Sequence, residues 1–448
     1  MPNSLDHAKP SLGAKKRSAH YALLALVVPM LLAHLTAPLM GLVDTAVLGH
    51  MQGSHYLAGA SFAALVLTQI YWICGFIRMS ATGLSAQARG QQSTEAASRV
   101  LYQSLFSAVV IGAAILALGP LILYVSFVFT DANDAVSKVI EDYFYVRLWG
   151  APAALANLAL IGWMLGQQQA RAVMAIQITG NLLNIGLNLL FVYVFDWDVK
   201  GVAGASVFVE YFIAFASLTY IFKGGIRHLQ FSWLGLKSLS VISKLNSAML
   251  GRNLALQACL VFMTFQGLRL GEQTAAINAI LMQFFVLISL GLDAVAYGVE
   301  AKIGEAKGAK SPRELKSNAL IGLFWSNGFA LVYTLLFIFF GVTIIHLLTD
   351  LESLREASYQ FLPMVYALPL VGHWCFLMDG VFVGLTRAKA MRNSMVLGAL
   401  LVFFPVWWFL QEHGNWALWL ALLALLAFRG VSLSAYFVYL ARQHRLID

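Results

Sequence analysis

Long apolar blocks alternate with short polar connections along the whole chain. Each block is close to the roughly 20 helical residues that cross about 30 Å of hydrocarbon. We therefore expect twelve membrane-spanning helices in this sequence. The blocks cover residues 20–48, 57–86, 100–129, 143–166, 171–195, 201–223, 245–269, 274–299, 317–347, 357–386, 393–411 and 416–440.

The composition agrees with this pattern, because 60% of the residues are hydrophobic and 11% are charged. A soluble core cannot absorb that much apolar surface, so lipid must cover most of it. The net charge of +8 comes from Lys and Arg clusters between apolar blocks, which favours membrane orientation over nucleic-acid binding. The run that begins near His20 is too long for a cleaved signal peptide and should remain as a span.

The positive charges also predict an orientation. With the N-terminus in the cytoplasm, most of the 29 Lys and Arg residues fall on the cytoplasmic side, and outer connections carry acids such as Asp134 and Glu141. Cytoplasmic connections of membrane proteins are enriched in Lys and Arg. We therefore expect a multi-pass protein of the bacterial inner membrane with both termini in the cytoplasm.

The chain divides near its middle, where residues 224–244 place Lys237 and Lys244 around Phe231 and Trp233. Such an amphipathic segment is expected to lie on the inner leaflet. The predicted organisation is a cytoplasmic tail, an N-lobe, this linker, a C-lobe and a second cytoplasmic tail. The corresponding boundaries are 1–19, 20–223, 224–244, 245–440 and 441–448.

The two halves of the chain repeat. Gly162–Ala172 can be laid on Gly380–Ala390, and at the same offset Gly180 meets Gly398. Small residues recur in any helix-packing sequence, but several collinear matches favour a duplication. Six spans in each half give both halves the same topology, hence a pseudo-two-fold axis along the membrane normal. The predicted fold is an all-α integral membrane protein of two six-helix lobes.

Polar side chains within the spans are the candidate functional residues, because a charge inside the membrane is costly. Asp44 lies near the outer end of the first span, at the depth expected for the last amide of a stripe on the fifth span. The stripe, with one amide of the fourth span added, consists of Gln177, Asn181, Asn184, Asn188 and Asn157. Amides exposed to lipid would lack hydrogen-bond partners, so we expect an N-lobe polar network that faces Asp44.

Asp44 has no obvious Lys or Arg partner in the sequence. Such a carboxyl can take up a proton and release it when a cation or a conformational change favours the charged form. The alternative is an interfacial aspartate that reaches for headgroups. Pro29 in the same span removes a helical hydrogen bond, so it is either a hinge that responds to Asp44 or a purely structural kink.

Four further charges are secondary candidates. Arg78 occupies the repeat position of Asp293, and we expect the two to face each other across the cytoplasmic side and latch it. Asp379 is either a functional group or the structural partner of Arg429, and the role of Glu210 stays open. The three cysteines show no metal-ligand spacing, so we expect no metal and no cofactor.

The order and spacing of these residues resemble the multidrug and toxic compound extrusion (MATE) family, specifically its DinF branch, over about residues 20–440. The residues that carry the resemblance are Pro29, Asp44, Arg147, Pro152, Asn157, Gly162, Gly166, Asn184, Asn188, Gly201, Gly204, Asp379, Gly384 and Arg387. The resemblance implies two six-helix lobes, an outward-opening cleft, and export of cationic lipophilic compounds in exchange for protons or sodium. It also implies that Asp44 accepts the proton, that Pro29 bends the first helix, and that Asn157, Asn184 and Asn188 belong to the N-lobe network.

Two positions depart from the family pattern. Related DinF-branch proteins often carry aspartate where this chain has Asn188, and the NorM branch has a glutamate where this chain has Val261. The C-lobe sodium site therefore looks incomplete despite Asp379, and both departures favour proton coupling through Asp44. Sodium coupling stays open as the alternative.

Other function classes fit less well. A membrane-embedded enzyme would need a catalytic motif, and the chain contains no Gly-x-x-x-x-Gly-Lys, His-Glu-x-x-His or Cys-x-x-Cys. A lipid or lipid-linked precursor flippase of the same superfamily would favour a basic cavity, whereas the intramembrane charges here are mixed. The expected function is a multidrug antiporter that works as a monomer in the bilayer on small organic cations.

Overall fold

The computed structural model describes residues 12–51, 53–128, 130, 132–226 and 229–447. Within these residues eleven helices are long and apolar enough to cross a membrane, and the bent pair α5 and α6 makes a twelfth span. The predicted helical fold class and span number are therefore confirmed. Most of the predicted N-terminal tail, and the last residue of the C-terminal one, lie outside the described residues.

Eight helices build the first half of the chain. They are α1 (Leu12–Gly49), α2 (Ser54–Ile73), α3 (Phe76–Gly90), α4 (Thr94–Val128), α5 (Asp134–Leu148), α6 (Ala151–Gly166), α7 (Ala170–Tyr193) and α8 (Asp198–Lys223). Helices α2 and α3 follow one another as a single span, Ser54–Gly90.

The second half has the same plan with more irregular turns. Its elements are η1 (Phe231–Leu234), α9 (Leu236–Arg269), α10 (Glu272–Gly308), α11 (Pro312–Leu348), α12 (Glu352–Tyr359), α13 (Leu362–Gly384), α14 (Ala388–Gly398), η2 (Ala399–Phe403), α15 (Phe404–Leu410), η3 (Gln411–His413) and α16 (Asn415–Arg442). The eleventh span contains the π-helical turn η2, which ends two residues before Pro405, where the missing N–H of proline disturbs regular hydrogen bonding.

Two boundaries differ from the sequence prediction. The fourth span is longer and bends by 48° between α5 and α6, since Pro152 has no N–H with which to continue the α5 hydrogen-bond ladder. Helix α9 begins at Leu236, inside the segment predicted as a linker. That segment lacks Pro and carries good helix formers after Gly235, so the seventh span extends into it.

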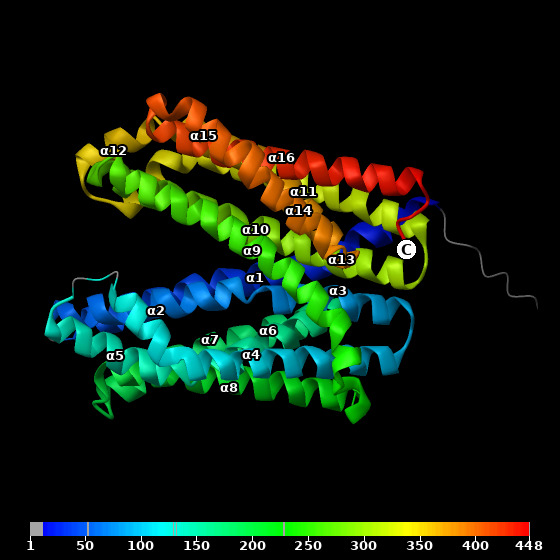
Figure 1. The fold of residues 1–448 in the computed structure, drawn as a ribbon, viewed down its shortest axis with the longest axis horizontal. Coiled ribbons are helices and arrows are strands. Elements are labelled where there is room, and N and C mark those ends of the chain that lie inside the picture. The colour runs from blue at the N-terminus through cyan, green and yellow to red at the C-terminus, as the bar shows by residue number, and fades with distance from the viewer. Residues whose placement is uncertain (1–11, 52, 129, 131, 227–228, 448) are drawn as a thin grey trace, which may run out of the picture.

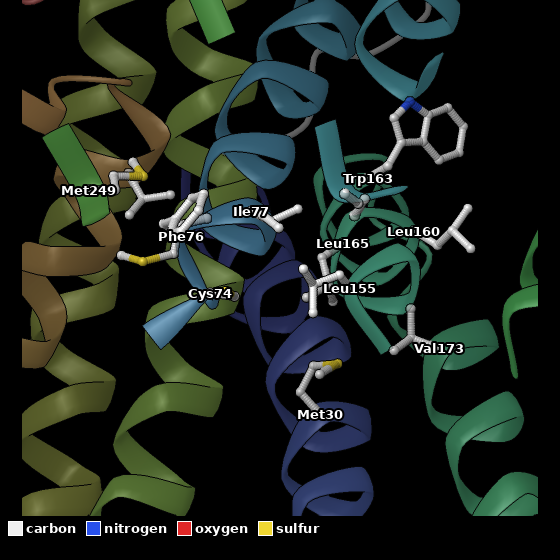
Figure 2. Close-up of a cluster of buried hydrophobic side chains, with 14 of the residues drawn as sticks. Met30, Cys74, Phe76, Ile77, Leu155, Leu160, Trp163, Leu165, Val173 and Met249 are labelled. Atoms are coloured by element: carbon white, nitrogen blue, oxygen red, sulfur yellow. The ribbon is translucent and has the colours of Figure 1, made fainter. Parts of the chain in front are cut away.

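The helices form two groups, α1–α8 and α9–α16, which lie closest at the end of the bundle that holds the C-terminus (Figure 1). We call this the termini end and the opposite one the far end. One buried cluster joins the N-lobe to the seam between the lobes, and a second fills the C-lobe. Figure 2 shows part of the first, with Met249 of α9 close to Phe76 of α3.

Small residues let the two lobes approach closely at the termini end. A Cβ added to Gly304 of α10 would lie 2.5 Å from the Cβ of Ala86 of α3, and a Cβ on Gly83 or Gly308 would overlap the backbone of the other lobe. Such close backbone approach is typical of helix packing in membranes. The seam along α3 and α10 is therefore tightly closed at this end.

Candidate functional site

The predicted contact between the first and fifth spans is present. Asn188 of α7 donates a hydrogen bond through Nδ2 to Asp44 Oδ1 of α1 at 2.5 Å. The same amide lies 3.1 Å from Asn184 Oδ1, and Asn184 donates to Ser206 Oγ of α8 at 3.3 Å. Asn184 and Asn188 are fully buried, so the chain of polar contacts from Asp44 runs into the interior of the N-lobe.

The rest of the predicted network is only partly in place. Asn181 donates to Thr36 Oγ1 of α1 at 2.7 Å, one helical level further toward the termini end. The Gln177 side chain is half-buried and makes no hydrogen bond with any residue that the structure describes. Asn157 was predicted to face Asp44, but it donates instead to the backbone oxygen of Glu210 at 2.9 Å, because α6 packs against α8.

Among the described residues Asp44 lacks an ion-pair partner, as Asp293 of α10 also does, and in this it differs from three other acids within the spans. Among the described residues no Lys or Arg comes within ion-pair distance of it, whereas Glu210, Glu300 and Asp379 are each paired with arginine. The Oδ1 atom of Asn188 beside it is buried and has no hydrogen-bond donor. Asp44 is therefore a half-buried carboxyl held by an amide, with no ion-pair partner among the described residues.

Glu210, whose role the sequence left open, pairs with Arg147. Arg147 Nη1 of α5 lies 2.7 Å from Glu210 Oε1 of α8, and both side chains are more than four-fifths buried. The arginine also lies over the ring of Tyr71, 5.9 Å from its centroid. Removing one partner of a buried pair leaves an uncompensated charge, so this pair fixes α5 against α8.

An ion pair does join Arg78 to the other lobe, but its acidic partner is Glu300 and not the predicted Asp293. Arg78 Nη1 lies 3.0 Å from Glu300 Oε2, and its guanidinium lies 3.9 Å from the ring centroid of Tyr297. Asp293 is two helical turns further toward the far end and makes no ion pair among the described residues. The contact of Ala86 with Gly304 explains the difference, because it sets α3 further along α10 than the sequence repeat implied.

In the C-lobe, Asp379 is held by two arginines. Arg429 Nη2 lies 2.6 Å from Asp379 Oδ1, which supports the structural pairing considered from the sequence, and Arg252 pairs with the other oxygen. Sequence reasoning missed Arg252 and Glu300 as functional candidates, although Arg252 lies inside a predicted span and Glu300 directly follows one. A charge inside a span was the signal that could have identified them.

A second set of polar contacts closes the termini end. Glu305 of α10 accepts hydrogen bonds from Gln168 at 2.6 Å and from Arg89 at 3.3 Å, and Lys302 donates to Gln168 at 2.8 Å. Gln87 of α3 donates to the backbone oxygen of Gly384 at 2.9 Å. Both contacts join the N-lobe to the C-lobe through residues in or beside turns.

Two further expectations concern the hinge and bound ions. Helix α1 is continuous through Pro29 and Pro38. The predicted bend at Pro29 therefore concerns a different conformational state of the protein. The part of the chain that the structure describes holds no group of three or more His, Cys, Asp and Glu side chains arranged for a metal ion.

Comparison with known proteins gives consistent results. The model of the MatE family matches residues 29–190 and 249–409, one segment in each half, as the predicted duplication requires. The chain is 38% identical to the DNA damage-inducible protein F of Escherichia coli, over 93% of this chain and 92% of that protein. It is 28% identical to the probable multidrug resistance protein NorM of Shewanella oneidensis, over 41% and 40% of the two chains.

Solved structures show the same fold. One is described as the outward-facing conformation of a multidrug resistance MATE family transporter of the MOP superfamily, and it superposes with a TM-score of 0.84. It is 18% identical in sequence, and the match covers 98% of this chain and all of the other.

Proposed function

Because the chain belongs to the MATE family of multidrug and toxic compound transporters, we propose that it exports lipophilic organic cations in exchange for protons. It is a membrane transporter and not an enzyme, as its relatives are. The observation that carries the coupling proposal is the hydrogen bond from Asn188 to an Asp44 carboxyl that no arginine or lysine neutralises.

The chemistry of Asp44 supports proton exchange. A charged carboxylate in a lobe interior is costly unless a positive group or a proton joins it. In the proposed cycle a proton enters from the far end and neutralises Asp44, and a cationic substrate is favoured when that proton leaves. The amide of Asn188 holds the carboxylate in place, because a charged acceptor binds an N–H donor more strongly than a neutral one does.

The seam supports alternating access. Glu300, Gly304 and Gly308 place one face of α10 against the N-lobe at the termini end. The same helical face continues toward the far end as Gln283 and Val286, whose side chains are exposed. We therefore propose that the lobes separate at the far end in this state, which would be the outward-open one, and close there in the opposite state.

Pro29 is the proposed bending point of α1 between these states. The helix contacts the C-lobe helix α10 near its middle, where His34 Nδ1 lies 3.4 Å from the Leu290 oxygen, and contacts the N-lobe through Asp44. A change of charge at Asp44 would therefore act on a helix that touches both lobes. We place both chain termini in the cytoplasm, as the Lys and Arg distribution favours.

Transport in energised membrane vesicles tests the proposal. Efflux of a cationic dye is expected under an imposed pH gradient and not under a sodium gradient, and Asp44→Asn should abolish it. Asp350→Asn, which removes an acid exposed at the far end, should transport as the wild type does because surface ion pairs contribute little. Transport driven by a sodium gradient alone would show that the coupling ion is Na⁺ and not a proton. Normal transport by Asp44→Asn would refute the assignment of Asp44 as the coupling residue.

A further inference from the structure

A basic cavity lies where the two lobes are joined in sequence. It measures about 700 Å³, and its lining residues come from α4 of the N-lobe and from the η1–α9 segment that leads into the C-lobe. They are Arg99, Ser232, Trp233, Gly235, Lys237 and Ser238. Arg99 and Lys237 are both exposed, so their charges are available to a molecule in the cavity.

Hydrogen bonds between α4 and the η1–α9 segment form the floor of the cavity. Gln103 of α4, which is 5% exposed, donates through Nε2 to the Trp233 oxygen at 2.9 Å and to Ser238 Oγ at 2.8 Å. Arg99 Nη2 donates to the same Ser238 hydroxyl at 2.6 Å, and Trp233 is buried. These contacts hold the first turn of α9 against α4. The hydrogen bond from Nη2 also fixes the orientation of the Arg99 guanidinium beside the cavity.

The linker side of the cavity is apolar and positive. Phe231 is 82% exposed and Val241 is 63% exposed, although both are large hydrophobic side chains. Residues 224–244 contain no Asp or Glu. Helix α4 begins at Thr94 and α9 at Leu236, so the cavity lies at the ends of two spans, where lipid headgroups meet a membrane protein.

We propose that this cavity binds the phosphate-bearing headgroup of an anionic phospholipid. Arginine and lysine with nearby hydroxyl donors match the oxygens of a phosphodiester. Exposed Phe231 and Val241 offer contact to acyl chains, which a free phosphate ion could not use. A lipid bound there touches α4 and α9 together, so it stabilises the joint about which the lobes move.

Native mass spectrometry of the delipidated full chain tests this proposal, with phosphatidylglycerol and phosphatidylcholine added in turn. We expect phosphatidylglycerol to remain bound and phosphatidylcholine not to. Arg99→Gln/Lys237→Gln should weaken phosphatidylglycerol binding about tenfold or more, since each basic residue near the headgroup adds to the attraction. The matched control Lys310→Gln/Arg313→Gln removes two exposed charges from the α10–α11 connection and the first turn of α11, and should leave binding unchanged.

Three results would overturn the proposal. They are equal retention of both lipids, equal loss of binding in the control variant, and displacement of phosphatidylglycerol by inorganic phosphate at equal concentration. If the double variant does not fold, Lys237→Gln alone serves, because no other residue that the structure describes is bound by the Lys237 ammonium. That variant should still bind phosphatidylglycerol more weakly than wild type, and unchanged binding would contradict the site.

Discussion

Asn188 Nδ2 lies 2.5 Å from Asp44 Oδ1, so an amide of α7 holds a carboxyl of α1 that no arginine or lysine neutralises in the described part of the chain. The pair joins the helix that touches both lobes to the interior of one lobe. The proton-coupling account depends on this relationship, and each prediction below tests either the pair or the ion pairs that hold the lobes around it.

Removing the amide should shift the pH dependence of substrate binding. In Asn188→Ala the ionised form of Asp44 loses a charge-assisted hydrogen bond worth about 1.5–3 kcal/mol. The proton should then leave only at a higher pH, so the midpoint of cationic-dye binding should rise by about one to two pH units. Dye fluorescence polarisation across a pH series measures this, with Asn327→Ala on the exposed face of α11 as the control. An unmoved midpoint would separate Asn188 from the coupling step.

Exchanging the charges of the interlobe ion pair should restore what either single change removes. Arg78→Glu and Glu300→Arg each place two like charges at a buried contact, and an unpaired buried charge costs about 3–5 kcal/mol. Dye efflux should fall sharply in both single variants, at equal protein levels, and recover in the double variant. The exchange of Arg78 with Asp293 should not recover, since Asp293 is not its partner. Recovery of dye efflux in the Arg78–Asp293 exchange would contradict this assignment and support the pairing predicted from the sequence repeat.

The two arginines on Asp379 predict an order of stabilities. Asp379→Asn leaves Arg252 and Arg429 without a counter-charge, whereas Arg252→Gln leaves Asp379 paired with Arg429 at 2.6 Å. We expect the first substitution to cost about 3–5 kcal/mol and the second clearly less. Thermal unfolding in detergent gives the comparison. An equal or larger loss in Arg252→Gln would mean that Arg252 carries the pairing.

A single methyl group in the seam should impair closure at the termini end. In Gly304→Ala the new Cβ would lie 2.5 Å from that of Ala86, well inside the ordinary contact distance of about 3.5–4.0 Å. Overpacking of this kind costs about 1–3 kcal/mol, so dye efflux should slow. Gly328→Ala on α11 meets nothing within 4 Å and is the matched control. Equal rates in the two variants would show that closure does not require this contact.

Sequence reasoning reached the spans and the Asp44–Asn188 contact because both depend on regular spacing. Span length follows from bilayer thickness, and amides three and four residues apart share one face of a helix. The depth of Asn188 in the fifth span then matches that of Asp44 in the first. These properties give the depth and the helix face of each residue, and the packing of α1 against α7 then brings the two side chains together.

The remaining contacts depend on which helices lie side by side and in which register. The spacing of residues along the sequence specifies neither. Asn157 bonds the Glu210 backbone because α6 lies against α8, and no periodicity specifies that neighbour. The partner of Arg78 depends on how far α3 is set along α10, a register determined by Ala86 and Gly304. A repeat relates equivalent depths in the two lobes, but it does not fix their register across the seam.

Proton release on substrate binding tests the central claim most directly. The purified protein in weakly buffered detergent solution is mixed with a cationic dye, and a pH indicator measures the protons released. The account predicts roughly one proton for each dye bound by the wild type, and none by Asp44→Asn even where the dye still binds. Release of the same amount by Asp44→Asn would contradict the account, because the exchanged proton would then come from another group.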